Sequence, residues 1–276
     1  MGKDMEINKF AEQLKATGGY DTPPDTEKTA CDRLFGRFDW WFNLGMIRTF
    51  YSGNRFARRG EFTSRAWCEH AFMIFRYVEK CGGRISVRGA ENFISTDEPF
   101  VFVANHMSML ETMVLPGILL LFRDVTIVVK QSLFNYPLFG KVMHALKPIS
   151  VTRVNPREDL KLMLNEGTRS LKNGTSVIMF PQSTRSSTFI PEKFNTIGVK
   201  LAQRAGVRIL PVALKTDFEG VGRILRDFGP IDRSKKVFFS FGKPLSIENN
   251  RKETHRETVD FIRDKLTEWE KETPGE

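Results

Sequence analysis

The chain has 276 residues, 41% apolar and 27% charged, and its 42 Lys and Arg against 33 Asp and Glu give a formal net charge of +9. This is the composition of a soluble or peripheral globular protein, with either one large domain and a helical addition or two small domains. The excess positive charge favours an anionic partner and leaves nucleic acid, lipid headgroups and phosphorylated substrates open.

Three kinds of feature are not evident in the sequence. The three cysteines form no CxxC pair and the four histidines no HExxH pattern, so we expect free thiols in a reducing compartment and no metal site. The longest apolar run, 113–122, is shorter than the roughly 20 residues that span a bilayer. The polar, acidic start lacks the basic and apolar segments of a signal peptide.

Residues 1–30 are predicted to be a polar N-terminal tail, with a short frayed helix followed by a loose connection. Residues 31–82 predict two amphipathic helices, because apolar side chains recur there at helical spacing. The first stripe comprises Phe35, Phe38, Phe42, Met46 and Phe50, and the second comprises Trp67, Ala71, Ile74 and Val78. The arginines between and along them are Arg48, Arg55, Arg58, Arg59 and Arg65.

Two interpretations of the segment 31–82 are open. The helices can form a membrane-docking motif, with aromatic rings at the acyl boundary and guanidinium groups on the phosphates of anionic lipids. Alternatively, both helices pack on the core and the arginines belong to a solvated linker.

Residues 83–276 are predicted to form an α/β domain with a mostly parallel central sheet flanked by helices. The strand candidates are 84–88, 100–104, 125–129, 149–151, 176–180, 207–214 and 237–241, and the helix candidates between them are 111–122, 137–146, 157–172 and 194–205. The apolar stripe in 251–270 predicts a C-terminal helix docked on the domain. Ligands of such sheets bind beyond the carboxyl ends of the strands.

The apolar run 100–104 stops at Asn105 and His106, which puts His106 at the end of a central strand. Ser108 followed by Glu111 is typical of a helix N-terminus with a capping box. With His106 in the loop and Glu111 in the first turn, the carboxylate can orient the imidazole, and the histidine can act as general base toward a hydroxyl. The alternative is that Glu111 only caps its helix and His106 is a polar loop residue.

Two further strand ends carry cations. The run 176–180 leads into a loop with hydroxyls and Arg185, which is able to hold a phosphate through its donors and guanidinium group. The strand candidate 149–151 is followed by Arg153. A polar turn with an exposed arginine is the alternative for each stretch.

Five blocks of the chain, in order, resemble the glycerolipid acyltransferase superfamily, and most closely its bacterial 1-acylglycerol-3-phosphate acyltransferases. The blocks are Asn105-His106 with an acid five residues after the histidine, 130–140, 149–153, 180–186 and 210–213. The similarity covers roughly residues 83 to 245. The helical pair ahead of them is also similar to the membrane-docking motif of that family.

The resemblance implies direct transfer of a fatty acyl group from acyl-CoA or acyl carrier protein to a lysophospholipid hydroxyl, without a further cofactor. It implies His106 as general base and Glu111 as its acidic partner. The substrate-binding residues that match the family's blocks are Asn105, Lys130, Arg153, Gln182, Ser183, Thr184 and Arg185. We expect lysophosphatidic acid as the acceptor, and a monotopic or peripheral protein at the cytoplasmic face of the inner membrane.

Nucleic acid is not an expected partner, because the aromatic residues follow helical stripes and do not form a basic stacking surface. Two positions depart from the family's pattern. Glu111 stands where Asp is usual, and Gln182-Ser183 replaces Glu-Gly, which removes a carboxylate partner for a cation and restricts the loop. The acceptor is therefore open: the alternatives are another lyso-lipid, or a catalytically weak lipid-binding member of the family.

Overall fold

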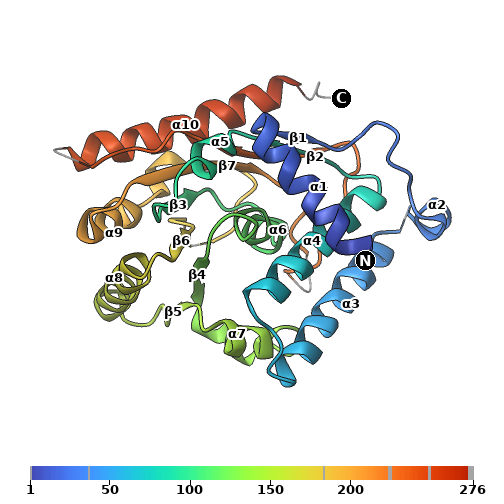
Figure 1. Cartoon of the computed structure of the whole chain (residues 1–276), viewed down its shortest axis with the longest axis horizontal. Coiled ribbons are helices and arrows are strands. Elements are labelled where there is room, and N and C mark those ends of the chain that lie inside the picture. Colours follow the sequence, from blue (N-terminus) through green and yellow to red (C-terminus); the bar gives the residue numbers. More distant parts are fainter. Residues whose placement is uncertain (1, 37, 183, 223–225, 248–249, 273–276) are drawn as a thin grey trace.

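The computed structural model describes residues 2–36, 38–182, 184–222, 226–247 and 250–272 (Figure 1). Its strands are β1 (Tyr20–Asp21), β2 (Arg84–Arg88), β3 (Val101–Ala104), β4 (Val125–Lys130), β5 (Ile149–Val151), β6 (Ser176–Met179), β7 (Ile209–Lys215) and β8 (Lys236–Phe241). They form one sheet in the order β1-β2-β8-β7-β3-β6-β4-β5. The pairs from β7 to β5 and the pair β2–β8 are parallel, whereas β1–β2 and β7–β8 are antiparallel. The prediction of a mostly parallel sheet is confirmed, and only β1 lies outside the predicted strands.

Helices cover both faces of this sheet. They are α1 (Gly2–Thr17), α2 (Ala30–Phe35), α3 (Asp39–Arg58), α4 (Ser64–Lys80), α5 (Glu91–Ile94), α6 (Leu110–Leu119), α7 (Gly140–Leu146), α8 (Pro156–Lys172), α9 (Ile197–Ala205) and α10 (Arg251–Glu272), with the short 3₁₀ helices η1 (Gln131–Asn135) and η2 (Pro191–Lys193). Figure 1 shows α8, α9 and α10 at the left and top, and α1, α3 and α4 at the right. The predicted helices, including the C-terminal one, are confirmed with shifted ends.

The central strands explain this layering. In β7, Leu210, Val212 and Leu214 belong to the hydrophobic cluster under α1, α3, α4, α6 and α7. Ile209 and Ala213 belong to the cluster under α8, α9 and α10. Because successive side chains of a strand point to opposite faces, an uninterrupted apolar strand requires cover on both sides. The result is a sheet between two helical layers.

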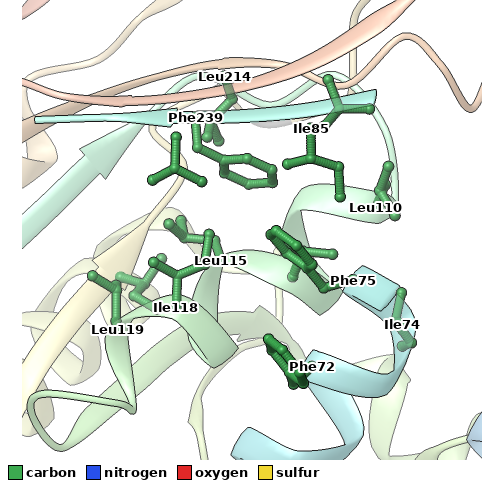
Figure 2. Packing of buried hydrophobic residues seen from close by; sticks show 14 of the residues in the cluster. Phe72, Ile74, Phe75, Ile85, Leu110, Leu115, Ile118, Leu119, Leu214 and Phe239 are labelled. Atoms are coloured by element: carbon green, nitrogen blue, oxygen red, sulfur yellow. The ribbon is translucent and has the colours of Figure 1, made fainter. Parts of the chain in front are cut away.

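Helices α4 and α6 approach each other closely inside the first cluster. A Cβ atom at Gly117 of α6 would lie 2.5 Å from the Cβ atom of Ala71 in α4. Figure 2 shows Phe75 of α4 and Leu115 of α6 in the same packed group as Phe239 of the sheet. The helical pair ahead of the sheet is therefore part of the main core.

The N-terminal segment contains the predicted helix, but this helix packs on the core and a short strand follows it where a loose connection was predicted. The α1 helix buries Ile7, Phe10 and Leu14, which follow one another at spacings of three and four residues on one helical face. The strand β1 then pairs with β2, and the Tyr20 ring packs edge-on against Phe10, with ring centroids 4.9 Å apart. The prediction for this segment relied on its overall polarity and missed the sparse apolar stripe of Ile7, Phe10 and Leu14.

The aromatic residues of 31–82 divide into two sets. Phe42, Met46 and Phe50 of the first stripe and Ala71, Ile74 and Val78 of the second are buried, as expected for helices packed on a core. A second set stays exposed and forms what we call the outer patch of α2 and α3: Leu34, Phe35, Phe38, Trp40, Leu44 and Tyr51. In the part of the chain that the structure describes, no helix combines the length and apolar character needed to cross a bilayer.

Candidate active site

The carboxyl ends of β3, β4, β5 and β6 open into one pocket of about 820 Å³. Six residues predicted from the sequence line it: His106, Lys130, Arg153, Gln182, Thr184 and Arg185. Ser183 lies outside the described residues. The topology thus brings together side chains from four separate strand ends, at the edge where a parallel sheet is expected to bind its ligand.

His106 and Glu111 form the centre of this site. Nδ1 of His106 lies 2.8 Å from Oε1 of Glu111. His106 occupies the loop after β3, and Glu111 the first turn of α6, which is the arrangement that lets residues five apart meet. The imidazole stacks on Phe180 at the end of β6, with ring centroids 4.6 Å apart, and keeps 15% of its side chain exposed to the pocket.

The Glu111 carboxylate is buried and accepts hydrogen bonds on both oxygens. Oε1 accepts from the Met107 backbone N–H at 2.7 Å and from the Ser108 backbone N–H at 2.9 Å. Oε2 accepts from the Ser108 hydroxyl at 2.9 Å and from the Thr216 hydroxyl. Burial alone would raise the pKa of Glu111, but the hydrogen bond and charge of His106, followed by the Thr216 hydroxyl, lower it below its usual value.

These bonds determine the proton position on the imidazole. A carboxylate can only accept, so Nδ1 of His106 must donate, and in the neutral imidazole Nε2 then has the free lone pair. A histidine in this state can take a proton from a hydroxyl, and Glu111 then stabilises the imidazolium. The predicted capping box forms only in part. Glu111 accepts from the Ser108 backbone N–H, but the Ser108 hydroxyl accepts from the Leu110 backbone N–H at 3.0 Å and not from that of Glu111, and Met109 is the N-cap of α6.

Gln182 holds the backbone of the histidine. Its Oε1 accepts from the His106 backbone N–H at 2.9 Å, and the His106 carbonyl accepts from the Ser186 backbone N–H at 2.9 Å. The loop after β6 therefore clamps the loop after β3 on both sides of one residue. An amide oxygen is sufficient for this contact, so Gln182 provides the acceptor that His106 needs without the charge and the second acceptor oxygen of a carboxylate.

Asn105 lies elsewhere than predicted. Its side chain is 1% exposed and exchanges two hydrogen bonds with the Leu214 backbone, donating to the carbonyl at 2.7 Å and accepting from the N–H at 2.8 Å. It is absent from the residues that line the pocket. The amide continues the β3–β7 pairing by one residue, so Asn105 fixes the strand end that carries His106.

The loop after β5 holds Arg153 in a left-handed backbone conformation, with φ of +61°. Asp159 in the first turn of α8 accepts from the Arg153 backbone N–H at 2.6 Å and from the Thr152 backbone N–H at 2.8 Å. These bonds hold a strained residue beside the pocket, which is where such strain is commonly found. In the described part of the chain, neither Arg153 nor Lys130 has a carboxylate within ion-pair distance.

Comparison with known proteins agrees with this geometry. The profile of the Acyltransferase family matches residues 84–215. This chain carries an acyltransferase-family domain. The match confirms the resemblance of the sequence to the glycerolipid acyltransferases. It covers β2 to β7 and includes every site residue described above except Thr216.

Two curated relatives and one solved structure are similar to the chain that carries this acyltransferase domain. The "1-acyl-sn-glycerol-3-phosphate acyltransferase" of Pseudomonas aeruginosa is 36% identical over 158 residues, 57% of this chain and 59% of that protein. A chloroplastic protein of that name from Arabidopsis thaliana is 31% identical over 142 residues, 51% of this chain and 38% of that protein. The chain thus spans less than two thirds of these relatives. The crystal structure of the 1-acyl-sn-glycerophosphate (LPA) acyltransferase PlsC from Thermotoga maritima shares the fold, with a TM-score of 0.62, 20% identity and coverage of 86% of this chain and 95% of that one.

No motif of the sequence points to two acidic residues in the β7–β8 connection, which follows the matched segment 84–215. Asp227 pairs with Arg185 at 2.6 Å, and Glu219 is 2% exposed with neither carboxyl oxygen in hydrogen-bond contact in the described structure. Burial, and then the charge of Glu111, raise the pKa of Glu219 to about 8. Both residues follow β7 in an irregular segment without a recognisable motif, so only the fold reveals their position. No cluster of three or more metal-ligating side chains is found among the described residues.

Proposed function

We propose that this protein is an O-acyltransferase that moves a fatty acyl group from a thioester to the hydroxyl of lysophosphatidic acid and forms phosphatidic acid. The observation that carries the proposal is the pair of His106 and Glu111 in a pocket with two different sides. The names of the relatives support this acceptor.

The two sides of the pocket suit the two parts of the substrates. One side, between α3, α4, α6 and α7, is apolar and includes Phe62, Ile74, Met113 and Val142, which suits an acyl chain. The other side presents the cations Lys130, Arg153 and Arg185, which suit the phosphate of the acceptor. His106 lines the same pocket, so a hydroxyl and a thioester carbonyl bound there can both reach its imidazole.

The chemistry follows from the free lone pair on Nε2 of His106. Nε2 removes the proton of the acceptor hydroxyl as the oxygen attacks the thioester carbonyl, and Glu111 stabilises the imidazolium. The tetrahedral intermediate collapses, the carbon–sulfur bond breaks, and the imidazolium protonates the thiolate. The ester and the free thiol are the products, and no acyl-enzyme forms. The donor is acyl-CoA or acyl carrier protein, and the step requires no other cofactor.

The outer patch of α2 and α3 supports a location at the membrane surface. Its aromatic residues lie on the outside of the helix whose inner side, at Phe50 and Gly53, lines the apolar part of the pocket. Arg48 and Arg55 are exposed on the same helix, where they can meet anionic headgroups. We therefore place the protein as a monotopic or peripheral enzyme at the cytoplasmic face of the inner membrane, where both donors are found.

The test is thiol release from oleoyl-CoA by the purified protein in detergent, with and without lysophosphatidic acid. We expect release that depends on the acceptor and that is lost in His106→Ala. The proposal would be contradicted if the parent protein released no thiol from either oleoyl-CoA or an acylated acyl carrier protein, with lysophosphatidic acid or with any of a panel of other lysophospholipids as acceptor. Binding to vesicles without any turnover would then favour a lipid-binding protein.

A further inference from the structure

Asp227 in the β7–β8 connection is the residue on which this inference rests. We propose that Asp227 is a positioning residue that holds Arg185 in the orientation in which it binds the acceptor phosphate, and thereby favours acceptors that carry a phosphate. The inference rests on the proposed function and deepens it. It concerns a residue that the motifs of the sequence do not include.

The contact itself is close and partly shielded from water. Nη2 of Arg185 donates to Oδ1 of Asp227 at 2.6 Å, and Nη1 donates to the carbonyl of Arg226 at 3.4 Å. The two side chains are 24% and 14% exposed. Solvent therefore screens this ion pair less than one on the open surface, and it can fix the guanidinium plane.

The pair leaves Arg185 able to bind a second anion. A guanidinium group has five N–H donors in a planar fork, and the contacts with Arg226 and Asp227 use two of them. The remaining donors can make the paired hydrogen bonds that phosphate favours. Asp227 therefore need not be displaced when the acceptor enters. Because a free arginine loses rotamer freedom on binding, a side chain fixed beforehand binds at lower entropic cost.

The position of Asp227 also connects three loops at the mouth of the pocket. Arg185 belongs to the loop after β6, Asp227 to the connection after β7, and Tyr136 to the turn after η1. All three residues line the pocket. Partial burial, and then the neighbouring Asp227, raise the pKa of the Tyr136 hydroxyl, so the carboxylate faces this ring as well.

The experiment compares Asp227→Asn, which removes the charge and keeps the shape, with Asp227→Glu, which keeps the charge. The control is Asp232→Asn, the same change at an acid of the same connection, which hydrogen-bonds Ser234 in a local turn away from the pocket. Each variant of the full chain is assayed with oleoyl-CoA and either lysophosphatidic acid or monoacylglycerol, an acceptor without phosphate.

We expect Asp227→Asn to raise KM for lysophosphatidic acid about tenfold. The kcat, the donor KM and any rate with monoacylglycerol should stay near those of the parent. The KM of Asp227→Glu for lysophosphatidic acid should lie close to that of the parent, and Asp232→Asn should leave this KM unchanged. In an Arg185→Ala background, Asp227→Asn should cause no further loss, because the two residues act through one contact.

Three results would overturn the inference: equal losses with both acceptors, additive losses in the Arg185→Ala background, or a lower KM for lysophosphatidic acid in Asp227→Asn. The last would mean that Asp227 competes with phosphate. If the parent protein is inactive with every acceptor, the proposed function fails, and calorimetric binding of glycerol 3-phosphate tests the inference separately. Equal affinity in the parent and Asp227→Asn would then reject it.

Discussion

At the scale of single residues, the site depends on one buried carboxylate. Glu111 accepts from His106, Ser108 and Thr216 and has no exposed surface. An ionised acceptor with this many donors is hydrogen-bonded on both oxygens, which offsets the cost of its burial. The same contacts hold the imidazole in one tautomer, so stability and catalysis depend on the same group.

Glu111→Gln tests this dependence. The amide presents N–H donors where the protein also presents donors, so we expect the imidazole to lose its fixed orientation and kcat to fall roughly 100-fold or more. The measurement is the initial rate of thiol release, with the thermal midpoint recorded beside it to show that the variant is folded at the assay temperature. A folded variant with nearly the full rate would show that Glu111 is only a helix cap.

Glu219 gives a prediction for stability against pH. Its pKa is about 8 in the folded protein, against roughly 4.3 for an unperturbed glutamate. Between about pH 4.3 and pH 8, Glu219 is ionised in the unfolded chain but keeps its proton in the folded protein. The stability of the folded protein is therefore highest below the unfolded pKa and is lost as pH rises toward 8. The Gln side chain of Glu219→Gln cannot ionise. The thermal midpoint of this variant minus that of the parent should therefore increase from pH 5 to pH 8.

The matched control for this measurement is Glu257→Gln, at an exposed position of α10. Its midpoint should follow the parent at every pH. Parallel curves for Glu219→Gln and the parent would show that Glu219 is ionised in the folded protein.

At the scale of elements, the turn between β5 and α8 presents Arg153. Asp159 holds this turn through the Thr152 and Arg153 backbone N–H groups, and its pKa is lowered by these bonds. In Asp159→Ala, Arg153 should no longer be held in its left-handed backbone conformation, and KM for lysophosphatidic acid should rise several-fold. Glu158→Ala, in the same helical turn, is the control and should leave KM unchanged. Equal effects of the two variants would indicate general loss of acidic charge at the start of α8.

The outer patch of α2 and α3 leads to a prediction about membrane binding. Trp40, Leu44 and Tyr51 are 56%, 50% and 68% exposed. Replacing all three by Ser should weaken co-sedimentation with anionic vesicles at least tenfold, because apolar area buried in the interface drives such binding. The control is Leu162→Ser, at a residue 42% exposed in α8, and this helix lies at the left of Figure 1 whereas α3 lies at the right. This variant should bind like the parent. Unchanged sedimentation of the triple variant would place the membrane contact elsewhere.

At the scale of the whole molecule, the N-terminal helices and the sheet share one core. A Cβ atom at Gly117 of α6 would meet that of Ala71 in α4, so Gly117→Ala should destabilise the protein by about 1–3 kcal/mol through overpacking. Adding Ala71→Gly removes the atom that the new methyl group meets and should recover part of the loss. Chemical denaturation measures both variants. No recovery in the double variant would show that the cost arises elsewhere than at this contact.

The sequence by itself determined the strands, most helices, the strand end at His106 and its pairing with Glu111. These depend on local periodicity and on residues close in the chain, which the fold does not rearrange. It also left a choice for 31–82, since an apolar stripe alone does not say whether core or lipid covers it. The structure divides that segment between a buried side and an exposed outer patch.

Only the tertiary structure decided the contacts between distant strand ends. Thr216 meets Glu111 across 105 positions and Asp227 meets Arg185 across 42, while Asn105 is turned inward to Leu214. None of these residues stands in a pattern that names its partner. They meet because parallel strands distant in the chain end at the same edge of one sheet, and strand order is set by packing of the whole core.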